Sequence, residues 1–140
     1  MTQRIGQDEL DRLFTAALEA AVARLEKDGH FFPLMFELRS DGTIQAVAML
    51  ETGAVAGDAV GRMFDLLRQR ATEGVIRGAA IACHHAGSDQ VEVRVRAPNY
   101  ASDIFVPFSI ETHGLIRRRR ELTLGAFEAH PADNAVFPEG

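Results

Sequence analysis

Cys83, His84 and His85 form the single cluster of reactive side chains in the sequence, where an extended segment ends. Cysteine and histidine are the residue types that serve thiol catalysis and zinc ligation. Alternation along a strand places Cys83 and His85 on one face and His84 on the other. A zinc site needs three or four protein ligands, so His113 or His130 would have to join the pair. We therefore expect no metal, and instead a buried thiol beside surface histidines.

The same geometry disfavours cysteine catalysis. His84 cannot act as a base for Cys83 from the opposite face, and no acid is evident that would orient His85. A single cysteine also excludes an internal disulfide and a multi-cysteine zinc site. We expect no catalytic residue and no cofactor. The alternative is a small metal- or thiol-dependent enzyme that uses Cys83, His84 and His85.

Arginines provide a second candidate site. The run 117–120, with Arg94 and Arg96 on a neighbouring strand, could form a basic stripe for phosphate or nucleic acid. The chain nevertheless has a net charge of -5, one Tyr and no Trp, which argues against nucleic acid as a partner. Glu92 and Glu111 are placed to pair with these arginines across strands. We expect a salt-bridged sheet surface on which Arg94 and Arg96 remain candidate binding residues.

Periodicity predicts the elements that must position these residues. Apolar residues spaced by three and four from Gln7 to Asp28 predict an amphipathic helix that ends at Gly29. Two apolar runs, His30 to Leu38 and Thr43 to Leu50, predict a hairpin. Both strands are apolar on both faces, so we expect that both faces are covered or that the strands lie centrally, and neither is expected at the edge of a sheet.

A second helix and a meander of strands follow. After a small-residue loop at 53–57, Asp58 is expected to cap a helix that ends at Gly74. The alternating pattern of the strand after residue 89 predicts that Arg94 and Arg96 face water. The expected strands and turn are Val75 to His85, Gln90 to Ala97, a turn at Pro98 to Ser102, Ile104 to Ile110, and Arg118 to Glu128.

This order of elements predicts an α+β fold. It reads helix-strand-strand-helix followed by a meander of three or four strands, in a mostly antiparallel sheet packed with two helices. We expect one domain over residues 1–140, with 130–140 as a C-terminal tail. No segment approaches the ~20 apolar residues that cross a bilayer, and no apolar run follows Arg4. With a single cysteine, a cytoplasmic protein is expected.

Core-strand residues carry a resemblance to known proteins. The segments Phe31 to Leu34, Val91 to Val95 and Ile104 to Phe108 resemble a family of small uncharacterised bacterial proteins, over roughly residues 31–137. That resemblance implies a bacterial source and a packing pattern, and it carries no function. The order of elements also resembles roadblock and profilin-like domains, which implies a dimerising or ligand-holding platform without naming a site.

Because no nucleophile-base-orienter set and no metal-ligand set can be assembled, we expect a non-enzymatic protein-interaction or small-ligand-binding module. A purely structural homodimer is a third possibility. Parity places Phe105, Pro107 and Phe127 on the outer side of the last two strands, where they would form an apolar patch for a homodimer. Val136 and Phe137 of the tail could instead cover that patch within one chain.

Overall fold

The computed structural model describes residues 6–31, 33–49, 59–85, 89–114 and 119–137 of the chain. All its strand pairings are antiparallel, which confirms the α+β class. The expected loop 53–57 and the Asp58 cap lie outside the described residues. The elements are α1 (Gln7–Asp28), β1 (Leu34–Arg39), β2 (Ile44–Met49), α2 (Ala59–Thr72), β3 (Ile76–His85), β4 (Gln90–Ala97), β5 (Tyr100–His113), β6 (Arg119–Leu124) and β7 (Glu128–Pro131).

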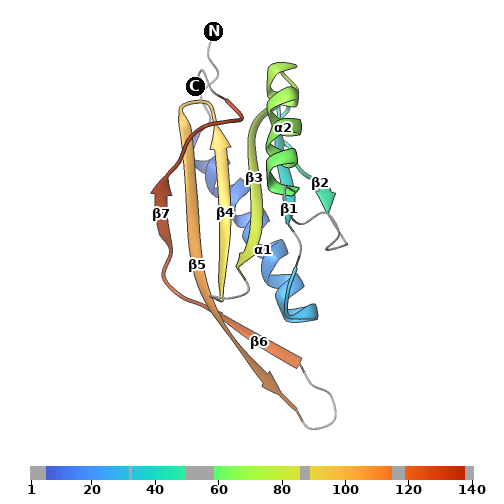
Figure 1. Cartoon of the computed structure of the whole chain (residues 1–140), viewed down its shortest axis with the longest axis vertical. Helices are drawn as coiled ribbons and strands as arrows, with labels where there is room; N and C mark the ends of the chain where they lie inside the picture. The colour runs from blue at the N-terminus through green and yellow to red at the C-terminus, as the bar shows by residue number, and fades with distance from the viewer. Residues whose placement is uncertain (1–5, 32, 50–58, 86–88, 115–118, 138–140) are drawn as a thin grey trace.

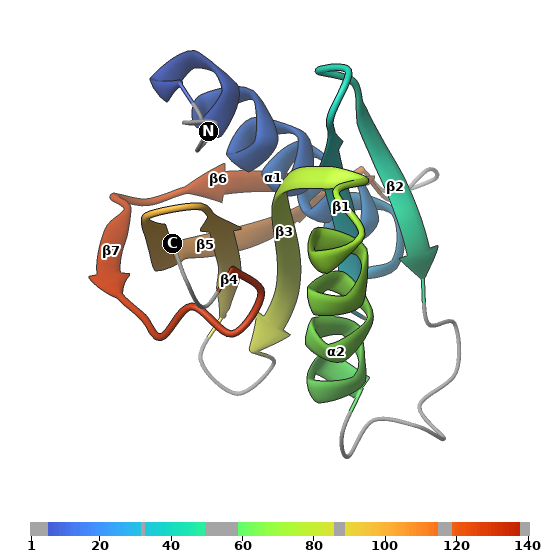
Figure 2. The same ribbon diagram turned by 90° about the horizontal axis from the view of Figure 1, so that it is seen from above.

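The strands form one sheet between two helices. The order is β2-β1-β3-β4-β5-β6, and β7 also pairs with β5. In Figure 1, α1 lies behind the sheet and α2 in front of it. Seen from above in Figure 2, α2 lies over the β1 and β3 side, whereas β4, β5 and β7 extend beyond it. Neither described helix is long and apolar enough to cross a membrane.

The first helix is marked by its burial pattern and its end. Gly29 adopts the left-handed conformation with φ +79, which a glycine reaches without steric cost. Its N–H donates to the Leu25 carbonyl at 2.8 Å, and Arg120 Nη1 donates to the Lys27 carbonyl at 2.8 Å. A cation there also offsets the negative end of the helix dipole. The buried face is as expected: Leu10, Leu13, Ala17, Leu18, Ala21 and Leu25.

Side chains alternate between the two faces of the strands and therefore form two separate hydrophobic cores. Leu34, Phe36 and Leu38 of β1 point to the α1 side, together with the valines of β4. The α2-side core is smaller, because only part of that face lies under the helix. Its buried members are Met35, Met63, Leu67, Ile76, Ala79, Ile81, Cys83 and Val136.

A buried ion pair fixes α2 to the sheet. Glu37 of β1 is fully buried on the α2 side, and Arg70 in the last turn of α2 binds its carboxylate through Nε and Nη2. The hydrogen bond with Glu37 raises the pKa of Arg70, so the arginine stays charged. A buried carboxylate needs such a partner, because an unpaired charge in the interior is strongly destabilising.

The structure corrects the expected place of the hairpin strands. β1 lies inside the sheet, but β2 is an edge strand that pairs with β1 alone in the described part of the chain. Its apolar residues reach both cores from the margin: Ile44 packs against the α1-side core and Val47 against the α2-side core. Apolar residues on both faces therefore indicated contact with two layers and not a central position.

The expected final strand, Arg118 to Glu128, is split into β6 and β7. β5 pairs with β7 through Ser102 to Phe105 and with β6 from Phe108 onward. Pro107 lies between these ladders and has no N–H to donate. Its carbonyl accepts from Gly125 N at 2.7 Å, where the chain passes from one strand to the other. A side chain at Gly125 would clash, since a Cβ there would lie 2.8 Å from Pro107 Cγ.

The turn expected at Pro98 to Ser102 is shorter than predicted. Ala97 pairs directly with Tyr100, so only Pro98 and Asn99 lie between β4 and β5. Asn99 has φ +63, a left-handed conformation that asparagine tolerates better than most residues. The ladder therefore starts at Tyr100, and the connection is a regular tight turn.

The segment expected as a tail begins inside β7 and then returns to the sheet. His130 and Pro131 pair with β5. Asn134 Nδ2 then donates to the Ala97 carbonyl at 2.9 Å, which holds the segment over the β4–β5 turn. Val136 is 1% exposed in the α2-side core. The tail thus docks within its own chain.

The expected apolar patch of Phe105, Pro107 and Phe127 does not form. Phe127 is 57% exposed and packs edge-on against Phe14 of α1, with 5.3 Å between ring centroids. Phe105 points to the other face, between His85 and His130. The prediction assumed that side chains alternate between the two faces without interruption from residue 122 to residue 127. That alternation is broken, because β6 ends at Leu124 and β7 begins at Glu128.

We predict that Leu18→Ala and Phe36→Ala each lower the free energy of unfolding by about 2–5 kcal/mol, because each removes a large side chain from the α1-side core. Urea unfolding followed by circular dichroism measures the change. Leu66→Ala is the control, since Leu66 of α2 is exposed and its loss should cost less than about 0.5 kcal/mol. Equal effects at the three positions would contradict the assignment of this core.

Candidate functional site

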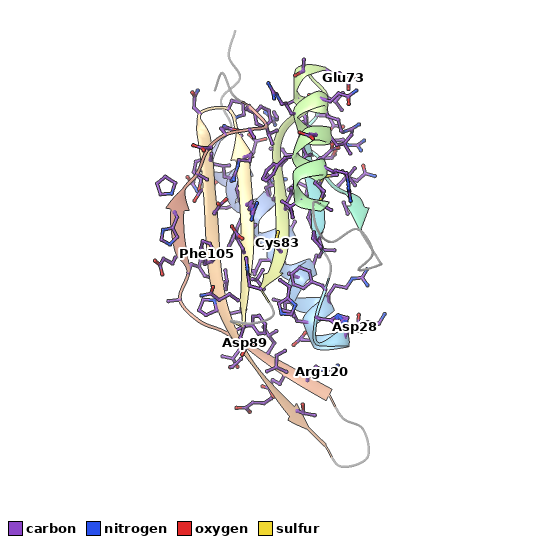
Figure 3. The ribbon with its side chains drawn as sticks, in the orientation of Figure 1. Asp28, Glu73, Cys83, Asp89, Phe105 and Arg120 are labelled. Atoms are coloured by element: carbon purple, nitrogen blue, oxygen red, sulfur yellow. The ribbon has the colours of Figure 1, made fainter. Side chains whose placement is uncertain are left out.

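Five of the six predicted site residues share the α2 face of the sheet. The ladder aligns Cys83 with Glu92 and Glu92 with Phe105, and the next row aligns Arg94 with Asp103. Figure 3 shows Cys83 and Phe105 over the neighbouring strands, beyond the part of the face that α2 covers. We call the following residues the charged strip: His85, Glu92, Arg94, Arg96, Asp103 and Phe105.

The strip is more buried than the sequence suggested. Its face of β4 was expected to meet water, but Glu92 and Arg96 are each only 4% exposed. The side chains of α2 and the returning C-terminal segment flank this face, as the contacts of Phe64 and Asn134 show. The alternation of charged residues along β4 therefore correctly indicated a polar face. The exposure of that face depends on α2 and the C-terminal segment, which are distant in the sequence.

Glu92 organises one half of the strip. Its Oε1 lies 2.7 Å from His85 Nε2, and its Oε2 accepts from Arg94 Nε at 3.1 Å. Burial lowers the pKa of Arg94, but the hydrogen bond with Glu92 raises it, and the net shift is upward. The buried carboxylate is therefore held between a permanent cation and an imidazole.

Arg96 organises the other half. Its Nη1 donates to the carbonyls of Val95 and Ser102, both at 3.0 Å, and its Nη2 donates to Asp103 Oδ1 at 2.8 Å. Its buried Nε has no partner among the described residues. Most of the hydrogen-bonding capacity of this guanidinium is used by its own chain, so Arg96 holds the strip together and offers little to a ligand.

An aromatic side chain from α2 borders the strip. The Phe64 ring centroid lies 5.2 Å from the guanidinium carbon of Arg96 and 5.9 Å from that of Arg94. Both distances are within the range of cation–π attraction. Phe64 therefore links the helix to the charged residues and separates them from the α2-side core.

The opposite border comes from β7. Phe105 lies between two histidines, with ring centroids 6.2 Å from His85 and 5.5 Å from His130. His130 Nε2 in turn lies 2.9 Å from Glu128 Oε1. Beside this row is an open depression lined by Arg96, Asp103, Pro131, Ala132 and Asp133. Asp133 is exposed and, with Glu128 of β7, makes this margin acidic, whereas Asp103 is partly buried and paired with Arg96.

Cys83 of β3 lies beside Glu92 of the strip and is buried in the α2-side core. Burial raises the pKa of its thiol to about 11, and the positive charge of Arg94 offsets only part of that effect. The reactive form of cysteine is the thiolate, so this thiol is a poor nucleophile near neutral pH. Glu92 does supply an acid that can orient His85, which the sequence did not reveal, but the same carboxylate raises the pKa of Cys83 further.

His84 is on the α1 side, away from the strip. Its ring stacks on Phe31 at 5.4 Å and lies 5.7 Å from the Phe108 ring. Burial lowers the pKa of His84, and the nearby His30 lowers it further. The cluster read from the sequence is therefore divided by the sheet, as alternation predicted.

The basic stripe that the sequence left as an alternative does not assemble among the described arginines. Arg94 and Arg96 face the α2 side, whereas Arg120 contacts the end of α1 on the other side, near Asp28 (Figure 3). Residues 117 and 118 lie outside the described part of the chain, as does the side chain of Arg119. Arg94, Arg96 and Arg120 therefore form no single phosphate-binding row, because the strands present them to opposite faces.

Sequence reasoning missed Asp103 and Phe64 as members of this region, and it considered His130 only as a third metal ligand. Each comes from a different element, and nothing in the spacing of residues 64, 103 and 130 indicates proximity. Among the described residues, no group of three His, Cys, Asp or Glu side chains could hold a metal. A second hollow of about 210 Å³, between Phe14 of α1 and Phe127, is apolar and lies on the opposite face.

No family model, curated protein or solved structure matches this chain. The resemblances to a small bacterial family and to roadblock and profilin-like domains therefore gain no support, and the site must be read from its own residues.

We predict that Cys83 in the folded protein resists thiol reagents near neutral pH, because burial both blocks access and raises the pKa of its thiol to about 11. Reaction with Ellman's reagent should be slow in buffer and fast in denaturant. Exposed cysteine introduced by Ser109→Cys is the matched control, since Ser109 is exposed on β5. Rapid labelling of native Cys83 would overturn this description of the thiol.

We also predict that His84 makes the fold less stable in mild acid. Its folded-state pKa is below the usual value of 6.5, so the unfolded chain binds the proton more readily and stability falls as pH drops below that value. His84→Phe should lose less stability than the wild type between about pH 7.5 and about pH 5.5, by urea unfolding. Leu66→Ala, which removes no titratable group from an exposed position of α2, should follow the wild type.

Proposed function

We propose that this chain is a non-enzymatic protein-interaction domain, and that its charged strip receives a segment of another protein. One observation carries the proposal. The α2 face of the sheet is only half covered by a helix, and the uncovered half holds charged and aromatic side chains in place of an apolar core. A surface needed only for packing would be at least as stable with apolar residues of similar volume.

The shape of the region favours a polypeptide over a small molecule. Small-molecule sites are usually enclosed clefts of about 300–1,000 Å³ that cover most of their ligand. The depression beside the strip has a volume of about 520 Å³, within that range, but it is open and would leave much of a small ligand exposed, and the hollow on the other face, at about 210 Å³, is below the range. A flat, partly polar surface with Arg94 and Phe105 within it has the composition of a protein interface.

The charges at the margin indicate the chemistry of the partner. Arg96 is engaged by its own chain, whereas Asp133 and Glu128 are exposed at the border of the depression and along β7. The chain as a whole carries a net charge of -5. A partner segment with lysine or arginine side chains would therefore be attracted to this margin. With a buried, unreacted thiol nearby, the proposal places the domain in a reducing compartment such as the cytoplasm.

The alternative of a thiol- or metal-dependent enzyme has less support. A thiol enzyme needs an accessible, activated thiolate, and burial raises the pKa of Cys83 to about 11. His84, one of its three expected residues, faces the other side of the sheet. Cys83→Ala is therefore expected to leave binding by the charged strip unchanged.

A site-specific crosslink tests the proposal. A photoreactive phenylalanine analogue at Glu128, which is exposed beside Phe105 on the ladder, should form one discrete adduct in cells of the source organism. The same analogue at Glu19, exposed on α1 at the opposite face, is the matched control. Mass spectrometry of the adduct should identify a partner segment that contains basic side chains.

Charge reversal then tests the chemistry. Asp133→Lys should reduce the Glu128 adduct several-fold, whereas Asp65→Lys, the same change at an exposed position of α2, should not. Adducts of equal yield from Glu19 and Glu128, or none from Glu128, would overturn the proposed surface. A Glu128 adduct that Asp133→Lys leaves unchanged would contradict the basic character of the partner.

A further inference from the structure

The edges of the sheet are blocked to different degrees. β2 forms one edge, and β6 and β7 together form the other in the described part of the chain. An edge strand presents unpaired N–H and C=O groups, so natural proteins commonly protect it with charged residues, proline or a short length. The three strands can be compared on these features.

The β6 and β7 edge carries all of these protections. β6 begins with Arg119, Arg120 and Glu121, so three of its six residues are charged. β7 is only four residues long and contains Glu128 and Pro131. A second chain that paired here would have to bury charges and would lose a hydrogen bond at the proline.

β2 carries neither charge nor proline. Its six residues read Ile-Gln-Ala-Val-Ala-Met, which spans about 20 Å of extended backbone. Gln45 and Ala46 are exposed, and Figure 2 shows the strand at the outer margin of the sheet, beyond both helices. One bulge interrupts its ladder with β1, between the partners of Met35 and Phe36, and leaves Ile44 to Ala46 in regular register.

We propose that β2 is a homodimer interface, in which it pairs antiparallel with β2 of a second copy across a two-fold axis. In such a pair the strand meets itself, so each side chain must tolerate its own copy or a near neighbour. Short uncharged residues such as Ala46 do so without repulsion. Each chain has a net charge of -5, so two copies repel each other over most of their surface. β2 has no charged residue, so two copies can approach there without direct repulsion.

The absence of charge on β2 also argues for a second copy over a strand of another protein. A heterologous strand is usually selected by complementary charges or by pockets for its side chains. β2 carries no charged residue, and its exposed Ala46 has only a methyl side chain. The two-fold axis of an antiparallel strand pair is perpendicular to the sheet, so both α2 helices and both charged strips would lie on the same side of the dimer. This inference does not depend on what the strip binds.

The mass in solution tests the pairing. The wild type at micromolar concentration should sediment as a species of twice the 15.3 kDa chain mass. Ala46→Lys places like charges in the shared ladder and should give the chain mass at the same concentration. Thr123→Lys, the same kind of change at an exposed position of β6, should leave the dimer intact. Melting followed by circular dichroism shows whether each variant is folded.

A second measurement keeps the test decisive if Ala46→Lys does not fold. Amide hydrogen exchange of wild-type Ile44 to Val47 should slow as the protein concentration rises, while exchange in β6 should not change. Three results would overturn the proposal: a species of 15.3 kDa at every concentration, a dimer that folded Ala46→Lys retains, or a dimer that only Thr123→Lys disrupts. None of them bears on crosslinking at Glu128.

Discussion

The ion pair between Glu37 and Arg70 determines how the rest of the α2 face is used. Glu37 is fully buried on β1, and a buried carboxylate without partners would be strongly destabilising. Arg39 Nε lies 3.5 Å from its Oε1, but Arg70 supplies the hydrogen bonds to both of its oxygens. Arg70 can reach it only if the last turn of α2 lies over β1 and β3. One helix, about 10 Å wide, cannot then also cover β4, β5 and β7. The uncovered half of the sheet face follows from this constraint.

The two faces of β4 differ in how their side chains are packed. The α1 face of β4 is packed with valines, but its other face carries Glu92, Arg94 and Arg96, which pair with one another and with Asp103. Phe64 at the border of α2 and the docked C-terminal segment shield these charges, so Glu92 and Arg96 are buried although the helix axis does not lie over them. Such a surface is stable in water and still presents aromatic and acidic groups to a partner.

The edges of the sheet show a similar division. Pro107 interrupts the outer ladder of β5, which forces the last segment into two short strands, and their charges and Pro131 protect that side. β2 lacks these features at the opposite end. The fold therefore has one edge that resists pairing and one that permits it. The face proposed for a partner and the edge proposed for a second copy do not overlap, so both can be occupied together.

The sequence by itself determined the local features, which are α1 and its end at Gly29, the start of β4, and the opposite faces of Cys83 and His84. These could be predicted because periodicity and glycine conformation depend on only a few neighbouring residues. Only the tertiary structure decided that β2 is an edge, that Phe105 and Phe127 face apart, and that Glu92 lies between His85 and Arg94. Strand order, and the burial that changes the Cys83 pKa, depend on which segments distant in the chain pack together. No spacing within one strand encodes that choice.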